Sequence, residues 1–113
     1  MAKSEYIIKG DFDELLNMLH SGILSGSVSA SFEDGSSFIS GGVRCAVRVY
    51  ERYSMLGENR VSLTITLFDD GEKIYTSGIT AGGSQAKLFK INTIGEESFL
   101  GRFNELIRDF QRG

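Results

Sequence analysis

Two side chains in this sequence are of the types that most often serve as general base and nucleophile, His20 and Cys45, and each type occurs once. A general base needs an acid or nucleophile within hydrogen-bond reach, and the sequence places none beside His20. Cys45 alternates with valines, where a cysteine behaves as a small hydrophobic side chain rather than as a reactive thiolate. We therefore predict structural roles for both, assign no catalytic residue and favour a protein that is not an enzyme.

The sequence offers few residues that could bind a metal ion or a cofactor. One histidine and one cysteine cannot complete a structural zinc site. The acidic residues come in pairs at predicted turns and helix starts, where carboxylates have ordinary structural uses, and none has the spacing of a calcium loop. We expect no metal and no cofactor.

A glycine-rich stretch is a weak candidate for an anion or ligand loop. Successive backbone amides can form a nest for an anion. This stretch, however, precedes a predicted strand and lacks the Lys-Ser/Thr ending of a phosphate-binding loop. A plain turn explains it more simply. The residues of the loop are Gly82, Gly83, Ser84 and Gln85.

Composition predicts one small domain. The chain has 113 residues, of which 41% are hydrophobic and 24% charged, enough for one packed core. No apolar run approaches the roughly 20 residues that cross a bilayer, and the first residues lack the apolar core of a secretory signal. The single cysteine excludes an internal disulfide and suits a reducing compartment. We expect a single cytoplasmic domain over residues 1–113 that does not enter a membrane.

Two amphipathic helices are predicted from apolar residues at helical spacing. Asp11 and Glu14 have the spacing of a capping box, and the apolar stripe that follows ends near Gly22 or runs on to Gly26. A second stripe predicts a C-terminal helix that starts near residues 93–96, again with capping-box spacing.

Between the helices the pattern is that of β-strands. Asp34-Gly35 is typical of a two-residue hairpin turn, so we predict a hairpin between residues 28–32 and 38–39. Gly41-Gly42 either turns the chain again or bends one long strand. Alternation predicts further strands at 43–50, 61–67 and 73–80, with a hairpin at Asp70-Gly71, and short strands at 6–8 and 87–91.

The register of these strands follows from matching their apolar rows. We expect Val49 to pair with Ile65. Val47 should pair with Leu67, which in turn pairs with Ile74. The valines then face the helices. The predicted fold class is α+β, with an antiparallel meander sheet of five to seven strands and both helices packed on one face.

On this register the outer face of the sheet, away from the helices, carries aromatic side chains interleaved with cations. Such a surface can be a solvated face, a protein interface or a base-stacking reader of single-stranded nucleic acid. The net charge of −3 and the lack of a basic-Gly-aromatic-Gly motif argue against nucleic acid. We expect a homodimer, or another protein partner, to cover this face. The candidate interface residues are Arg48, Tyr50, Arg52, Phe68, Lys73, Tyr75 and Ile79.

Three stretches carry a resemblance to a known family: residues 59–64, 80–85 and 89–100. They resemble a family of small uncharacterised proteins from Gram-positive bacteria. The resemblance implies a cytoplasmic bacterial protein without an assigned activity, and it carries over no functional residue. More loosely, an antiparallel sheet that grips a C-terminal helix resembles the helix-grip proteins, which hold apolar ligands, although this chain is short for that class.

The leading interpretation of function is a small non-enzymatic interaction module that self-associates through the outer sheet face. The alternative is a helix-grip-like domain, which could be enzymatic, that holds a small apolar molecule between the sheet and the C-terminal helix. Phe99, Phe103 and Phe110 are bulky enough to fill that space, which favours the interaction module.

Overall fold

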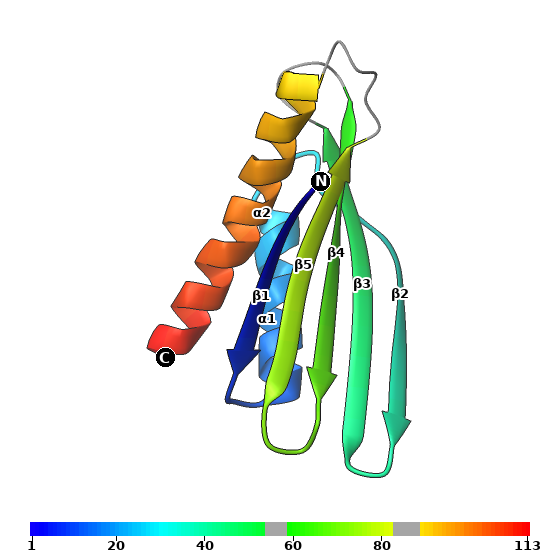
Figure 1. Ribbon diagram of the computed structural model, residues 1–113, viewed down its shortest axis with the longest axis vertical. Coiled ribbons are helices and arrows are strands. Elements are labelled where there is room, and N and C mark those ends of the chain that lie inside the picture. Colours follow the sequence, from blue (N-terminus) through cyan, green and yellow to red (C-terminus); the bar gives the residue numbers. More distant parts are fainter. Residues whose placement is uncertain (54–58, 83–88) are drawn as a thin grey trace.

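The chain forms one antiparallel sheet and two helices, as the α+β prediction expects (Figure 1). The computed structural model describes residues 1–53, 59–82 and 89–113, with side chains from residue 95 on in the last range. The elements in chain order are β1 (Ala2–Ile8), α1 (Phe12–Ser25), β2 (Ser31–Ser40), β3 (Val43–Tyr53), β4 (Arg60–Asp69), β5 (Ile74–Gly82) and α2 (Phe89–Arg112).

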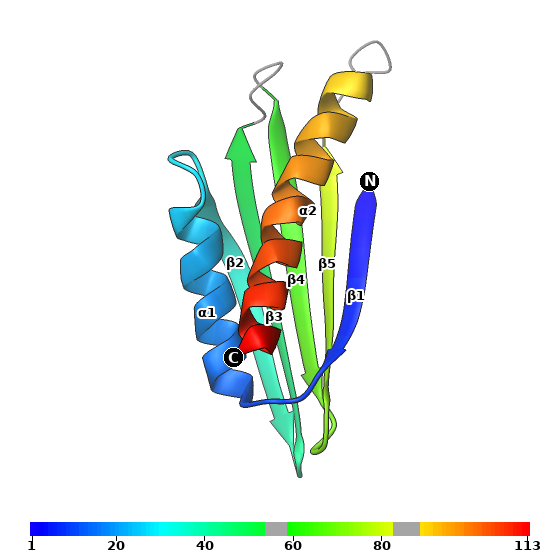
Figure 2. The same cartoon turned by 90° about the vertical axis from the view of Figure 1, so that its left-hand side faces the viewer.

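The sheet has the strand order β1-β5-β4-β3-β2, with every neighbouring pair antiparallel. Strands β2 to β5 form a meander, and β1 joins it at the β5 edge. The chain therefore leaves β1 at one edge, forms α1, and enters β2 at the other edge. Both helices cover the same face (Figure 2), so within the described ranges no helix lies on the opposite, outer face of the sheet.

Helix α1 begins at the predicted cap. The Asp11 carboxylate accepts a hydrogen bond from the Glu14 amide at 2.9 Å, which satisfies one of the free amides of the first turn. The helix runs to Ser25, which agrees with the predicted end at Gly26 rather than with the one near Gly22. Gly22 does not end it. Its missing side chain makes room for Leu106, whose Cδ2 would lie 2.4 Å from a Cβ at position 22.

Helix α2 begins earlier than predicted, at Phe89 rather than near residues 93–96. The predicted strand at 87–91 is therefore wrong for residues 89–91, and residues 87–88 lie outside the described ranges. Phe89 and Ile91 favour a strand locally, but local propensity is weak beside the apolar stripe that α2 buries. Neither helix, within the described ranges, is both long and apolar enough to cross a membrane.

The predicted hairpin at Asp34-Gly35 is wrong, because β2 runs straight through this dipeptide. The register shifts between Phe32 and Asp34, so the turn-like residues mark a β-bulge in a continuous edge strand. The chain turns instead at Gly41-Gly42, where Gly41 has a φ of 60°. In the described ranges four strands therefore lie between the helices, and with β1 they give a sheet of five, the lower end of the predicted five to seven.

The hairpin between β4 and β5 differs from the prediction by two residues. Asp69 lies opposite Ile74, so the loop has four residues rather than two, and Leu67 pairs with Thr76. The Asp70 carboxylate accepts hydrogen bonds from the amides of Lys73 and Glu72, each at 2.9 Å, and these bonds hold the pKa of Asp70 below its ordinary value. A shift of two residues keeps the predicted faces.

The register between β3 and β4 differs by one residue, which reverses the faces of β3. Ile65 lies opposite Arg48 rather than Val49, and Leu67 lies opposite Ala46 rather than Val47. Because side chains alternate along a strand, the row that faces the helices is Arg44, Ala46, Arg48, Tyr50 and Arg52. The row on the outer face is Val43, Cys45, Val47 and Val49.

The hydrophobic core fills the space between the sheet and the helices. Phe99, Phe103 and Ile107 of α2 are fully buried in one cluster with Leu63 and Ile65 of β4. A Cβ placed on Gly78 of β5 would lie 2.7 Å from the Phe103 ring. The prediction that α2 phenylalanines fill this space is confirmed for Phe99 and Phe103, whereas Phe110 is only partly buried.

Candidate interaction surface on the outer sheet face

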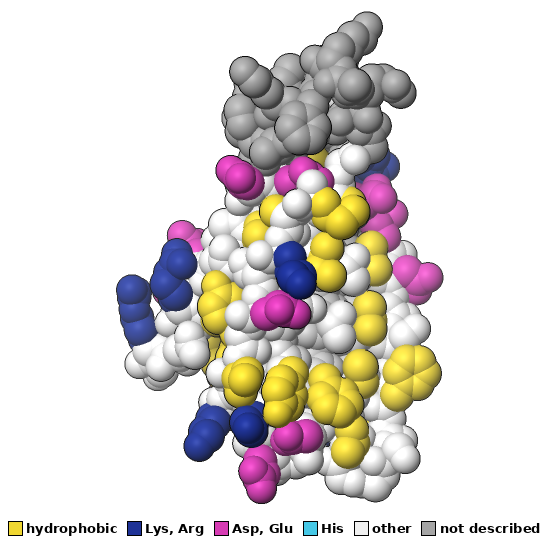
Figure 3. All heavy atoms as spheres, in the orientation of Figure 1, with side chains coloured by type: hydrophobic (Ala, Val, Ile, Leu, Met, Phe, Trp, Pro, Cys, Tyr) yellow, Lys and Arg dark blue, Asp and Glu magenta, His cyan; other side chains and the backbone are white. Residues whose placement is uncertain are grey.

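An unbroken apolar row crosses all five strands on the outer face. Its members are direct partners from strand to strand, and four of the five are exposed while Cys45 is half-buried. Figure 3 looks onto this face and shows hydrophobic side chains in a band across the lower part of the sheet. From β1 to β2, the apolar row consists of Ile7, Tyr75, Phe68, Cys45 and Phe38.

Two further rows cross the outer face next to the apolar row. The middle row consists of Glu5, Ser77, Thr66, Val47 and Ser36. The charged-end row consists of Lys3, Ile79, Thr64, Val49 and Asp34. Apolar side chains thus continue from the apolar row along β3 through Val47 and Val49, and Ile79 adds one on β5 beyond Ser77. The acidic and basic groups of these rows lie only on the edge strands β1 and β2.

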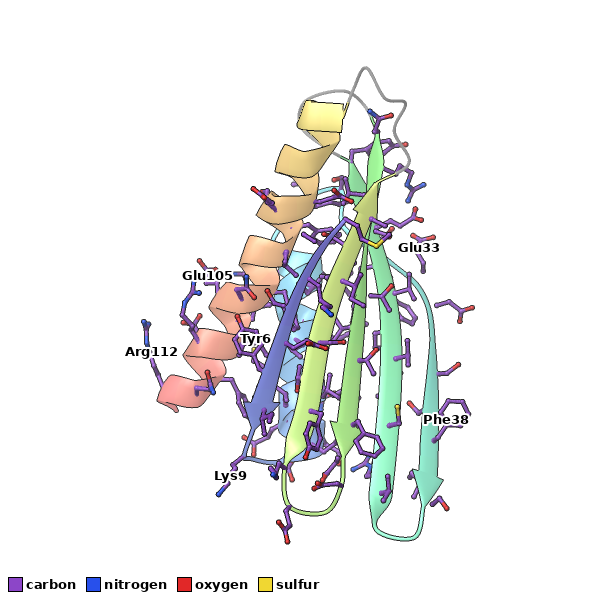
Figure 4. The ribbon with its side chains drawn as sticks, in the orientation of Figure 1. Tyr6, Lys9, Glu33, Phe38, Glu105 and Arg112 are labelled. Carbon is purple, nitrogen blue, oxygen red and sulfur yellow. The ribbon has the colours of Figure 1, made fainter. Side chains whose placement is uncertain are left out.

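The centre of the apolar row is an aromatic pair. The rings of Phe68 and Tyr75 are 6.1 Å apart between centroids and tilted by 47°, a geometry that stabilises aromatic pairs. The Lys73 ammonium lies 5.8 Å from the Tyr75 ring centroid and covers its rim. On the other side of the pair, at the β2 edge, Phe38 is labelled in Figure 4.

A shallow hollow of about 450 Å³ lies over β1, β5 and β4. It is open to solvent, so it suits a side chain from a partner surface better than an engulfed small molecule. Its lining combines apolar groups with a few polar ones. It includes Ile7, Phe68, Tyr75, Glu5, Thr66 and Ser77.

The seven candidate interface residues do not share one face, contrary to the prediction. Phe68, Tyr75 and Ile79 lie on the outer face and are exposed, with Lys73 beside the Tyr75 ring. The candidates from β3 lie on the opposite face, because the register is shifted by one residue. These three are Arg48, Tyr50 and Arg52.

Tyr50 belongs to the core. Its ring is fully buried, and its hydroxyl lies 2.8 Å from Nδ1 of His20 on α1. The Phe32 ring packs beside both, with centroids 5.4 Å from His20 and 5.8 Å from Tyr50. Burial raises the pKa of Tyr50 to about 12. His20 thus has a partner that its sequence position did not reveal, and the cluster joins α1, β3 and β2.

Arg52 and Arg44 tie β3 to the two helices. Arg52 donates to the Ser98 hydroxyl at 2.9 Å and lies over the Phe99 ring of α2. Arg44 forms two hydrogen bonds with the Asp13 carboxylate of α1, at 2.9 and 3.2 Å, and these bonds hold the pKa of Asp13 below its ordinary value. The aliphatic stems of these arginines pack over the edge of the core while their charged ends bind polar groups of the helices. The helix-facing side of β3 can therefore carry several arginines.

Arg48 stays within the sheet. Its guanidinium donates to the carbonyl oxygens of Ser36 and Val47, at 3.0 and 2.9 Å. The side chain crosses Gly35, where an added Cβ would lie 2.9 Å from Arg48 Cδ. The lack of a side chain at Gly35 therefore leaves room for Arg48, and Gly35 does not form a hairpin turn.

Five apolar residues of the three rows were missed as candidates: Ile7, Phe38, Cys45, Val47 and Val49. The alternation of apolar residues from 43 to 49 predicts that one side of this strand is apolar. It does not show whether that side faces the helices or the outer face of the sheet. Cys45, predicted to pack in the core, lies on the outer face between Phe68 and Phe38.

The weak candidate for an anion loop is described only at its first residue. The Gly82 amide donates to the Glu96 carboxylate at 2.9 Å, so this amide already binds an internal anion. Glu96 is buried and also accepts a hydrogen bond from the Met1 amino group at 2.8 Å. Gly83, Ser84 and Gln85 lie outside the described residues.

Comparison with known proteins identifies a family but no activity. No protein with a curated description matches the chain. A family model described as a family of unknown function, DUF6054, matches residues 1–111. This match spans nearly all of the elements described above. The chain belongs to the family of unknown function DUF6054.

Proposed function

We propose that this protein is a small non-enzymatic interaction module that self-associates through its outer sheet face. The observation that carries the proposal is the apolar row that runs from Ile7 on β1 to Phe38 on β2. Both helices lie on the other side of the sheet, so nothing in residues 1–53, 59–82 and 89–113 covers this row. A contiguous exposed apolar patch on a small protein is characteristic of an interaction site.

The size of the face supports a second copy as the partner. Five strands spaced about 4.8 Å apart, with about eight residues each at about 3.3 Å, span a plane of about 650 Å² before the relief of the side chains is added. A standard interface buries about 800 Å² on each partner. The outer face alone therefore provides the area of a stable dimer, and sheet-on-sheet packing is a common way to bury such a face.

The composition of the face also favours a protein partner over nucleic acid. Among the described residues of the three rows, the charged groups are one lysine and two acids, so no basic surface is available for phosphates. Arg48 and Arg52, two of the three cations that raised the nucleic-acid alternative, face the helices. The space that a helix-grip ligand would need beside α2 is occupied at Gly78 by the Phe103 ring.

Sedimentation velocity of the wild type and two matched variants tests the proposal. Phe38 and Ile39 are neighbours in the edge strand β2, with exposed fractions of 64% and 71%, and they point to opposite faces. At about 50 µM, a concentration suited to micromolar dimers, we expect the wild type to sediment with about twice its monomer mass of 12.4 kDa. Phe38→Asp should raise the dissociation constant by about tenfold or more, since it buries a charge in the interface.

Ile39→Asp is the control, because it adds the same charge at an equally exposed position that the proposed interface leaves open. It should leave the dissociation constant unchanged. A wild type that remains a monomer at this concentration would overturn the proposal. Equal effects of the two variants would overturn the assignment of the interface to the outer face.

A further inference from the structure

We infer that the second copy stacks on the outer face about a two-fold axis parallel to β4, so that Lys3 of each copy meets Asp34 of the other. This inference rests on the proposed self-association and adds its geometry and its specific contacts. The observation behind it is the order of side chains in the three cross-strand rows.

The charged-end row carries opposite charges at its two ends. Lys3 on β1 and Asp34 on β2 are the first and last members, separated by Ile79, Thr64 and Val49. Both charged groups lie at the surface of the single chain. The Lys3 ammonium is 3.8 Å from Glu5, and Asp34 accepts the amide of Gly35 at 2.7 Å.

A two-fold axis parallel to the strands carries each row onto the same row of the second copy, in reverse order. Because β4 is the third of five strands, an axis along β4 stacks β4 on β4, β5 on β3 and β1 on β2. In the charged-end row this brings Lys3 over Asp34 and Ile79 over Val49. These contacts occur twice in the dimer, since a two-fold interface is made of the same patch on both copies.

The apolar row is equally well matched by this axis. Phe68 lies over Phe68 of the second copy, at the centre of the interface, and Ile7 lies over Phe38. Tyr75 lies over Cys45. In the middle row the single charge, Glu5, lies over Ser36 at the polar rim. No pair of like charges meets in any of the three rows.

Other two-fold axes in the plane of the sheet match the rows less well. An axis across the strands through the middle row stacks Glu5 on Glu5 of the second copy and places Ile7 over Lys3 and Phe38 over Asp34. Like charges that face each other across an interface are destabilising. An axis across the strands through the apolar row leaves Ile79 and Val49 at the margin of the overlap, where they stay exposed.

The expected spacing allows the charged contact. Sheets that pack face to face lie about 10 Å apart, with their strands within about 30° of each other. A lysine and an aspartate that reach from opposite sheets span such a gap. The pair lies at the edge of the sheets, where charge pairs fix the orientation of partners more than they add affinity.

A charge exchange tests the inference by sedimentation equilibrium at low salt. Lys3→Asp and Asp34→Lys each replace two attractive contacts in the dimer by two repulsive ones, and each should raise the dissociation constant by about tenfold. The double variant restores opposite charges at both contacts, so its dissociation constant should return to within about threefold of the wild-type value. The effects of the single variants should shrink at 1 M salt, because salt screens exposed charges.

Asp109→Lys controls for net charge, because it makes the same change as Asp34→Lys on the exposed surface of α2. Circular dichroism melting curves of each variant check that it is folded. A wild-type dimer whose double variant stays as weak as the single variants would overturn the axis and leave the proposed self-association intact. A monomeric wild type would overturn both.

Discussion

The ring of Phe103 occupies the space that a side chain on Gly78 would need. A Cβ at position 78 would lie 2.7 Å from Cδ2 and 2.8 Å from Cε2 of the ring, and the ring is fully buried. This contact allows α2 to approach β5 closely, and it fixes the distance between the helix layer and the sheet. The stability of the fold should therefore be sensitive to both residues.

Replacement of Phe103 by alanine removes a fully buried phenylalanine ring near the centre of α2. We expect Phe103→Ala to lower the free energy of unfolding by about 3–5 kcal/mol, the usual cost of deleting a core aromatic group. Urea denaturation followed by circular dichroism measures this change. A loss below about 1 kcal/mol would mean that this face of α2 is not part of the core.

The space at Gly78 gives a second prediction. Gly78→Ala should lower the free energy of unfolding by about 1–3 kcal/mol, since the new methyl group overpacks against the ring. Gly101→Ala is the matched control, because nothing lies within 4 Å of the Cβ it would add. In the helix interior it should stabilise by about 0.5–1 kcal/mol. If both variants were equally harmless, the close contact would be refuted.

The burial of the Tyr50 hydroxyl predicts how stability depends on pH above 10. Tyr50 has a pKa of about 12 in the folded chain, raised by burial from an ordinary value of 10.0. The unfolded chain therefore releases this proton first, so the stabilisation is complete below pH 10 and is lost as the pH rises toward 12.

Urea denaturation at pH 8, 9, 10 and 11 tests this dependence. Tyr50→Phe lacks the ionisable hydroxyl, so its free energy of unfolding should fall less steeply above pH 10 than that of the wild type. The variant should also be less stable at pH 8, because His20 loses its hydrogen-bond partner. Parallel curves for the two proteins would contradict the burial of the Tyr50 hydroxyl.

Much of the fold could be predicted from the sequence because the helices and β4 have one clear apolar side each. The Asp11 cap and the alternation of Val61 to Leu67 were sufficient to define α1 and the core-facing row of β4. The hairpin predicted at Asp34-Gly35 was wrong because a dipeptide that favours turns also suits a β-bulge. The packing of Arg48 over Gly35 depends on the pairing of β2 with β3, so the sequence around Gly35 does not reveal it.

The candidate surface was only half predictable because β3 has two rows that could face the core. Four apolar residues beginning with Val43 form the more hydrophobic row, yet the core takes Ala46 and Tyr50 together with arginine stems. Contacts with α1 decide which side of β3 faces the core. Tyr50 bonds to His20 on α1, and Arg44 bonds to Asp13 at the start of the same helix. These partners are 30 and 31 residues away in sequence, so no local pattern reveals them.

The central claim, that a second copy covers the outer sheet face, is tested most directly by the reactivity of Cys45, the single cysteine of the chain. It lies in the apolar row between Phe68 and Phe38, so the unmodified protein carries its own probe of that face. The rate of maleimide labelling should fall as protein concentration rises, in step with the growth of the mass toward twice 12.4 kDa. Phe38→Asp should keep the fast rate throughout. A labelling rate that is independent of concentration while the mass doubles would contradict the claim, because the copies would then meet through another surface.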